Sequence, residues 1–155
     1  MRRIEFGPLP REHHVDPPGA RAPDLERAIS QLEEYFAGRR RRFDLPLDLS
    51  GATTGFQRDV YARLLDIDFG HVSSYGQIAR EIGKPHMARA VGQAVGANPI
   101  PIVIPCHRVV GSDLRLTGFG GGLAAKIALL KLEGIDVDGA SPTSRVRPEV
   151  IPLDL

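Results

Sequence analysis

The sequence has no tryptophan, one cysteine and two methionines, and aromatic residues make up only 6% of its 155 residues. A single cysteine excludes an internal disulfide and any zinc site built from several cysteines. No apolar run approaches the roughly 20 residues that span a bilayer, and no apolar signal segment follows Met1, so we expect no membrane association. A lone free thiol favours a reducing, cytoplasmic setting.

The remaining composition is typical of a globular domain. Hydrophobic residues make up 42% of the chain, charged residues make up 25%, and the net charge is +1. These values predict one ordinary domain, or a small domain with an appendage, that buries a sizeable core. Basic residues outnumber acidic ones between His71 and Gly134, which weakly favours a phosphate backbone as partner, since solvated charged faces are common.

The N-terminal third predicts few regular elements. Residues 1–7 alternate enough to form a strand, and a proline-rich loop follows that contains His13 and His14. Adjacent histidines without clustered carboxylates favour exposed loop residues over a metal site. Apolar residues at helical spacing then predict a packing helix between Asp24 and Gly38, with its inward side formed by Leu25, Ile29, Leu32 and Phe36. Residues 43–49 are typical of an edge strand or an extended linker.

Two capping-box patterns predict helices in the C-terminal part. Thr54 begins one that we expect to end near Asp68, and Ser74 begins a short helix over residues 75–81 that Gly83 ends. Pro85 suits the first turn of another helix, which reaches about residue 97. A last helix is expected over residues 123–133, and the proline- and serine-rich residues that follow predict a poorly ordered tail.

The helix, glycine turn and helix between residues 75 and 97 form a helix-turn-helix pattern. Such pairs bind DNA, but they also occur as plain packing units. The second helix is rich in glycine and alanine, which let a helix backbone approach a partner closely. Arg89 is the one arginine on that smooth surface. The pattern alone leaves both interpretations open.

Cys106 follows a β-branched run at residues 100–104 that is interrupted by Pro101. We interpret this run as a short strand that ends just before the thiol, a position from which a reactive group reaches a ligand. An ordinary thiol has a pKa of about 8.5, so a nucleophilic Cys106 needs a base or a nearby positive charge, and His107 follows directly. The alternative is that Cys106 is an inert buried residue and His107 a coincidental neighbour.

A longer string around Cys106 is similar to the active-site region of one family. It comprises Pro105-Cys106-His107-Arg108-Val109, with Asn98-Pro99 before it and Gly118-Phe119-Gly120-Gly121-Gly122-Leu123 and Lys126 after it. Residues 54–134 thereby resemble the O6-alkylguanine-DNA alkyltransferases. This resemblance implies irreversible, stoichiometric transfer of the alkyl group from O6-alkylguanine in double-stranded DNA to Cys106, after the nucleotide is flipped from the duplex. It implies no cofactor and no metal, and we expect a monomer.

The resemblance also implies a role for each matching residue. Cys106 is the alkyl acceptor, His107 the base that acts through a water, Glu133 the carboxylate that orients His107, and Asn98 the amide that holds the cysteine turn. Tyr75 crowds the phosphate beside the target and can donate a hydrogen bond to the guanine, and Arg89 fills the gap left in the duplex. Other positions assigned to DNA binding are Ala88, Gly92 and Lys84; those assigned to the base pocket are Tyr75, Val109, Phe119, Gly120 and Gly121.

The sequence departs from this family at two positions and in its N-terminal part. The family often has tyrosine at the position of Phe119 and serine or a bulkier residue at that of Gly120, so a hydroxyl contact to guanine O6 is missing unless a backbone amide or a water molecule replaces it. We expect an α+β fold: a small α/β region at residues 1–50, whose sheet is truncated or completed by other residues, and a mainly helical catalytic and DNA-binding domain at 51–135. Residues 136–155 are assigned as a C-terminal tail. The domain at residues 51–135 would hold the helix-turn-helix and the short active-site strand.

Two other functions remain open. One is an alkyltransferase-like protein that recognises alkylated DNA without repairing it; such proteins lack cysteine at the acceptor position, so Cys106 argues against it. The other is an unrelated Cys-His hydrolase, for which the sequence offers no identifiable oxyanion loop.

Overall fold

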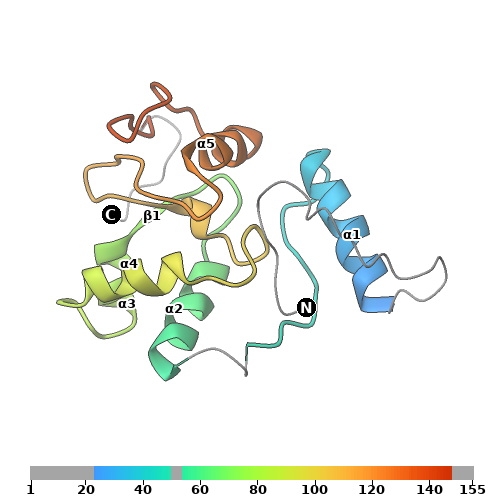
Figure 1. Ribbon diagram of the computed structural model, residues 1–155, viewed down its shortest axis with the longest axis horizontal. Coiled ribbons are helices and arrows are strands. Elements are labelled where there is room, and N and C mark those ends of the chain that lie inside the picture. The colour runs from blue at the N-terminus through green and yellow to red at the C-terminus, as the bar shows by residue number, and fades with distance from the viewer. Residues whose placement is uncertain (1–22, 50–53, 148–155) are drawn as a thin grey trace, which may run out of the picture.

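The computed structural model describes residues 23–49 and 54–147. It contains the helices α1 (Pro23–Phe36), α2 (Gly55–Leu65), α3 (Tyr75–Glu81), α4 (Ala88–Gly96) and α5 (Leu123–Leu132), a short 3-10 helix η1 (Cys106–Arg108), and the strands β1 (Ser73–Ser74) and β2 (Val109–Val110). The expected α+β class is therefore confirmed. Helix α1 lies to one side, joined to the rest by an extended segment, while α2, α3 and α4 gather under η1 and α5 (Figure 1).

Helices α2, α3 and α4 build the main core. Val60, Tyr61 and Leu64 of α2 pack with Ile78 of α3 and Val91 of α4, all fully buried. Burial of apolar side chains of this size stabilises the fold by roughly 1.5–3 kcal/mol each. The core thus joins the helix-turn-helix pair to α2, and the same cluster includes the cysteine.

The predicted helix starts at the two capping residues are confirmed. The Thr54 hydroxyl accepts from the Gln57 backbone N–H, and the Gln57 side chain accepts from the Thr54 N–H, at 3.2 and 2.9 Å. Ser74 accepts from the Gln77 N–H at 3.1 Å and begins α3. Gly83 has φ +72°, the left-handed conformation that ends a helix.

Two predicted helix boundaries are wrong. Helix α2 ends at Leu65 rather than near Asp68. Helix α4 begins at Ala88, because the chain first makes a turn in which the Met87 N–H donates to the Lys84 carbonyl at 2.9 Å. Pro85 therefore lies in the turn of the helix-turn-helix and not in the first turn of α4.

The inward side of α1 differs from the prediction. Its buried residues are Ala28, Gln31 and Tyr35, whereas Leu25 and Phe36 are 43% and 54% exposed. Gln31 is buried because its amide donates to the Asp44 carbonyl and accepts from the Asp44 N–H, at 2.9 and 2.8 Å. The helix thus contacts the backbone of an extended segment, residues 39–49, through a polar side chain that an apolar-periodicity rule ignores.

The predicted strand at residues 100–104 is wrong. These residues form a tight turn, in which the Ile104 N–H donates to the Ile100 carbonyl at 2.9 Å and Ile102 takes φ +74°. Such a φ is rare for a β-branched residue and costs on the order of 1–3 kcal/mol. The strand in this region is β2, which follows the cysteine and pairs in parallel with β1, Ser73 opposite Val109. This pairing brings the start of α3 beside the cysteine turn.

The segment after α5 is ordered up to Arg147, so the prediction of a poorly ordered tail is wrong there. Ile135, Val137 and Val146 are buried, and Val137 forms a bridge with Val146. The expected strand at residues 1–7 and the His13–His14 pair lie outside the described residues. Within residues 23–49 and 54–147, no helix is long and apolar enough to cross a membrane.

Candidate active site around Cys106

Cys106 begins η1 and is held by the turn that precedes it. Its side chain is buried, and its backbone N–H donates to the Ile104 carbonyl at 2.8 Å. The Asn98 side-chain amide closes this turn: Nδ2 donates to the Ile104 carbonyl at 2.8 Å and Oδ1 accepts from the Ile100 N–H at 3.0 Å. The predicted role of Asn98 in fixing the turn agrees with these contacts.

The environment of the thiol both hinders and favours its ionisation. Burial raises the pKa of Cys106, because the thiolate loses hydration. The Asn98 amide, the Lys126 ammonium and the backbone N–H groups of Cys106 and His107 act in the opposite direction, because each stabilises the negative charge. Burial prevails, so the thiol stays protonated at neutral pH and needs a base to become a nucleophile.

His107 is suited to be that base. It is fully buried, and its Nε2 lies 2.9 Å from Oε1 of Glu133. Burial lowers the pKa of His107 despite the opposing effect of Glu133, so the ring is neutral. A neutral ring that donates from Nε2 to a carboxylate leaves Nδ1 as an acceptor. Nδ1 is buried and has no hydrogen-bond partner among the described residues, so it is available for a proton.

Glu133 caps the C-terminal end of α5 and accepts hydrogen bonds from four residues. Besides His107, these are Arg108, whose Nε and Nη2 donate to Oε2 and Oε1 at 2.8 Å each, Tyr35 at 2.7 Å and the Gly70 N–H at 3.3 Å. The bonds from His107 and Arg108 outweigh the effect of burial and lower the pKa of Glu133 to about 2. The group is therefore a carboxylate at every physiological pH.

The sequence prediction missed two of these donors. Arg108 was noted only as a member of the motif, although its position directly after His107 was a usable signal. Tyr35 lies in α1, 98 residues before Glu133, and nothing in the local sequence connects the two. Tyr35 is fully buried, and its ring also packs against Phe43 and Phe69.

A second buried charge, Lys126, lies beside the thiol and belongs to α5, the helix that Glu133 caps. Lys126 is fully buried, and its Nζ donates to the Val109 carbonyl at 2.6 Å and to the Thr117 carbonyl at 3.3 Å. Burial lowers the pKa of Lys126 to about 8, against the favourable effect of Cys106. The Thr117 hydroxyl in turn shares a 2.6 Å hydrogen bond with the Tyr75 hydroxyl. Sequence reasoning gave no role to Lys126 or Thr117.

The structure places the predicted DNA-contacting residues on and before α4. Arg89 and Lys84 are exposed, and Arg89 forms no ion pair with any described residue. Ala88 is partly buried. Gly92 faces Tyr75: a Cβ built on it would lie 3.6 Å from Tyr75 Cδ1. Tyr75, which is predicted both to bind DNA and to line the base pocket, thus lies next to a predicted DNA-binding residue of α4. The contacts of these residues with DNA remain predictions.

The predicted pocket residues lie at different depths. Val109 is fully buried, Phe119 is partly buried against the core that contains Cys106, and Gly121 is intermediate. Gly120 is exposed, and a Cβ built on it would meet nothing within 4 Å. The position of Gly120 therefore has room for a side chain, and its role in the base pocket remains a prediction.

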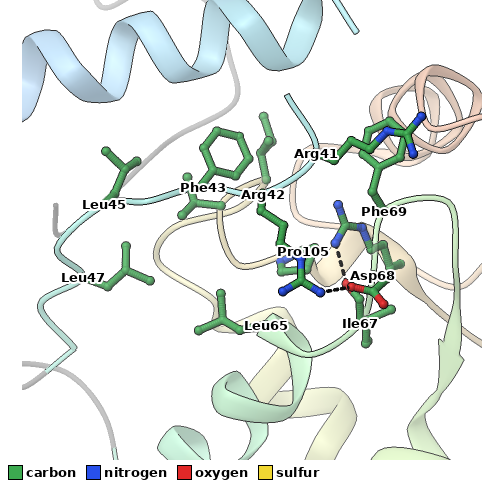
Figure 2. Close-up of a pocket in the computed structure, with 13 residues that line it drawn as sticks. Arg41, Arg42, Phe43, Leu45, Leu47, Leu65, Ile67, Asp68, Phe69 and Pro105 are labelled. Carbon is green, nitrogen blue, oxygen red and sulfur yellow. Dashed lines mark hydrogen bonds and ion pairs between the residues drawn. The ribbon is translucent and has the colours of Figure 1, made fainter. Parts of the chain in front are cut away.

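A cavity of about 310 Å³ opens beside the cysteine turn, between the residue 39–49 segment and the end of α2 (Figure 2). Pro105 lines it, but Cys106 does not. Its cationic side chains are already engaged: Arg42 pairs with Asp68 at 2.5 Å, and Arg41 lies over the Phe69 ring at 5.5 Å. Among the described residues, no group of three or more His, Cys, Asp or Glu side chains is placed to hold a metal ion.

The chain matches two family models along most of its length. Residues 55–135 match the DNA binding domain of 6-O-methylguanine DNA methyltransferase, and residues 2–49 match the ribonuclease-like domain of the same family. The chain therefore belongs to the 6-O-methylguanine DNA methyltransferase family, which confirms the resemblance seen in the sequence.

Individual relatives agree with this assignment. The methylated-DNA--protein-cysteine methyltransferase of Mycobacterium tuberculosis is 51% identical over 79% of this chain and 71% of its own length. That of Haemophilus influenzae is 45% identical over 87% of this chain and 73% of its own length.

Solved structures with the same fold include the O6-methylguanine methyltransferase of M. tuberculosis, at TM-score 0.66 and 52% identity, covering 70% of this chain and 65% of that chain. The match thus spans slightly less than two thirds of that structure. Another is S. pombe Atl1 in complex with damaged DNA containing O6-carboxymethylguanine, at TM-score 0.55 and 30% identity, covering 64% of this chain and 96% of that one.

Proposed function

We propose that this protein repairs DNA by moving the alkyl group of O6-alkylguanine onto the sulfur of Cys106. The observation that carries the proposal is that Cys106, His107 and Glu133 are all buried, with His107 hydrogen-bonded to Glu133, in a chain that belongs to the methyltransferase family. In the reaction the sulfur–carbon bond forms as the carbon–oxygen bond breaks, and the restored guanine, which stays in the DNA strand, takes up the proton that the thiol has lost. The thioether is stable, so each molecule reacts once.

The proton of the thiol moves to Nδ1 of His107 through a water molecule. This direction follows from the ring's hydrogen bond: Nε2 faces the Glu133 carboxylate, and Nδ1 is the remaining acceptor. The Glu133 carboxylate stabilises the imidazolium that forms, and the nearby Lys126 ammonium stabilises the thiolate. No step of this reaction requires a cofactor.

Double-stranded DNA that contains O6-alkylguanine is the proposed partner. The guanine oxygen inside a duplex cannot meet a buried sulfur, so the nucleotide has to rotate out of the stack. The exposed Arg89 on the small-residue surface of α4 would fill the resulting gap, and Tyr75, packed beside Gly92, would crowd the neighbouring phosphate. The protein would act as a monomer in the reducing cytoplasm, where Cys106 stays a free thiol.

The alternative, recognition of alkylated DNA without repair, is less well supported. The fold is shared with Atl1 at 30% identity, but relatives at 45–51% identity carry the name of the methyltransferase. The acceptor position, moreover, is the chain's only cysteine.

The test is mass spectrometry of the protein after it is mixed with a duplex that contains O6-methylguanine. The peptide that contains Cys106 should gain one methylene, and an undamaged duplex should leave it unchanged. Cys106→Ser should abolish the transfer and retain nearly full affinity for the duplex. An unmodified wild-type peptide, or repeated turnover by one molecule, would refute the proposal; loss of DNA binding in the serine variant would mean that the cysteine is structural.

A further inference from the structure

Oε1 of Glu133 is shared by three donors from two parts of the chain. The Tyr35 hydroxyl donates to it at 2.7 Å, Nη2 of Arg108 donates at 2.8 Å, and Nε2 of His107 lies at 2.9 Å. Tyr35 belongs to α1, whereas the other two residues belong to η1 next to the thiol. The family match assigns α1 and η1 to different domains of the family. One atom therefore connects the N-terminal helix to the base.

Tyr35 is not needed to hold Glu133 in place. The Arg108 guanidinium donates one hydrogen bond to each carboxylate oxygen, at 2.8 Å each, and the Gly70 N–H donates a further bond to Oε2. A planar guanidinium paired with a carboxylate in this way fixes the orientation of the group by itself. The tyrosine bond instead withdraws electron density from the oxygen that faces His107.

We propose that Tyr35 is a positioning residue that moderates the reactivity of Cys106, acting through Glu133 and His107. Every donor on Oε1 weakens what that oxygen offers to the others, so the tyrosine makes His107 a weaker base than it would be with Glu133 to itself. The inference rests on the proposed relay from Cys106 through His107 to Glu133.

The tyrosine donates across the whole working range of pH. Burial and the facing Glu133 carboxylate both raise the pKa of Tyr35, so its hydroxyl keeps its proton. The other ionisable groups that bear on the site are Arg108 beside Glu133, and Lys126, Tyr75 and Tyr61 beside the thiol. Of these groups, only Arg108 shares a hydrogen-bond acceptor with Tyr35, namely Oε1 of Glu133.

Tyr35→Phe removes the one hydroxyl and keeps the ring that packs against Phe43 and Phe69. The matched control is Tyr61→Phe: Tyr61 is equally buried, and its hydroxyl donates to the Ala94 carbonyl at 3.1 Å rather than to Glu133 or His107. A second comparison is Glu133→Gln, which makes His107 a weaker base. This variant should raise the pH at which Cys106 becomes reactive, whereas Tyr35→Phe should lower it.

The readout is the rate at which iodoacetamide alkylates Cys106 as a function of pH, followed by mass spectrometry of the peptide that contains this residue. Cys106 is the only cysteine, so the modified peptide reports on it alone, and the assay does not require DNA. Tyr35→Phe should move the midpoint to lower pH by about half a unit, which is roughly a threefold larger thiolate fraction below the midpoint. Tyr61→Phe should leave the midpoint in place.

A Tyr35→Phe midpoint that coincides with that of Tyr61→Phe, or that rises, would overturn the inference. Thermal unfolding of the two phenylalanine variants separates this result from a general loss of stability, since both lose one buried hydrogen bond. Failure of the proposed function is distinct: the wild-type protein would then leave methylated duplex unrepaired while the iodoacetamide midpoint still shifted in Tyr35→Phe.

Discussion

Substitution of Glu133 by glutamine tests the charged cluster most directly. The side chain keeps its shape but loses its charge, and only one of its two terminal atoms can still accept hydrogen bonds. Its new NH2 group must face donors on one side: either Nε of Arg108 and the Gly70 N–H, or Nη2 of Arg108, Tyr35 and His107. The buried Arg108 guanidinium is left without a counter-charge.

The size of the effect follows from two arguments. Removal of one partner from a buried ion pair costs roughly 3–5 kcal/mol, because the other charge stays buried and unpaired. The depression of the Glu133 pKa from an ordinary 4.5 to about 2 gives a similar figure, about 3 kcal/mol. Because the folded-state pKa is the lower one, this stability is present above pH 4.5 and is lost as the pH falls towards 2.

Urea unfolding of wild type and Glu133→Gln over a pH series measures this. The variant should be less stable by about 3–5 kcal/mol at neutral pH, and the difference should shrink below pH 4.5. Addition of Arg108→Met should recover part of the loss, because it removes the stranded charge. A difference under about 1 kcal/mol at neutral pH, or one that does not depend on pH, would refute the buried-pair reasoning. Alkylation of Cys106 should meanwhile require higher pH in both variants.

Two further substitutions test the DNA-facing side and the second charge. Arg89→Ala should slow repair of a lesion in duplex DNA far more than reaction with a free O6-alkylguanine base, whereas the charge-matched exposed control Arg145→Ala should affect neither; equal losses on both substrates would remove the gap-filling role. Lys126→Met should shift the pH dependence of Cys106 alkylation by iodoacetamide to higher pH, chiefly below pH 8, where the lysine is charged. A pH dependence that matches that of the exposed control Lys131→Met would mean that Lys126 contributes to packing alone and does not stabilise the thiolate.

Signals that span a few residues predicted their elements well. The reciprocal hydroxyl–amide pattern at Thr54 and the hydroxyl at Ser74 placed the starts of α2 and α3, because helix capping is decided within one turn of the chain. The resemblance of the motif around Cys106 to the alkyltransferases, and not a local rule, suggested the roles of Cys106, His107 and Asn98. The structure adds their geometry: a 3-10 turn rather than a strand end.

Features that depend on side-chain hydrogen bonds were out of reach. A β-branched run at residues 100–104 favours a strand, but the Asn98 side chain closes it into a turn with Ile102 in a left-handed conformation. The bond from Tyr35 to Glu133 joins segments 98 residues apart, and the inward side of α1 is decided by that contact and by the Gln31–Asp44 pair. Tertiary contacts of this kind override local periodicity.

Helix α5 contains Lys126, and Glu133, seven positions further along the chain, caps its C-terminal end. Seven residues are nearly two full helical turns and about 10 Å of rise, so the two side chains project in almost the same direction at different heights. A single inserted residue between them would rotate the carboxylate by about 100° away from His107 while the lysine stayed in place. The length of this segment is thus as constrained as the identity of its two charges.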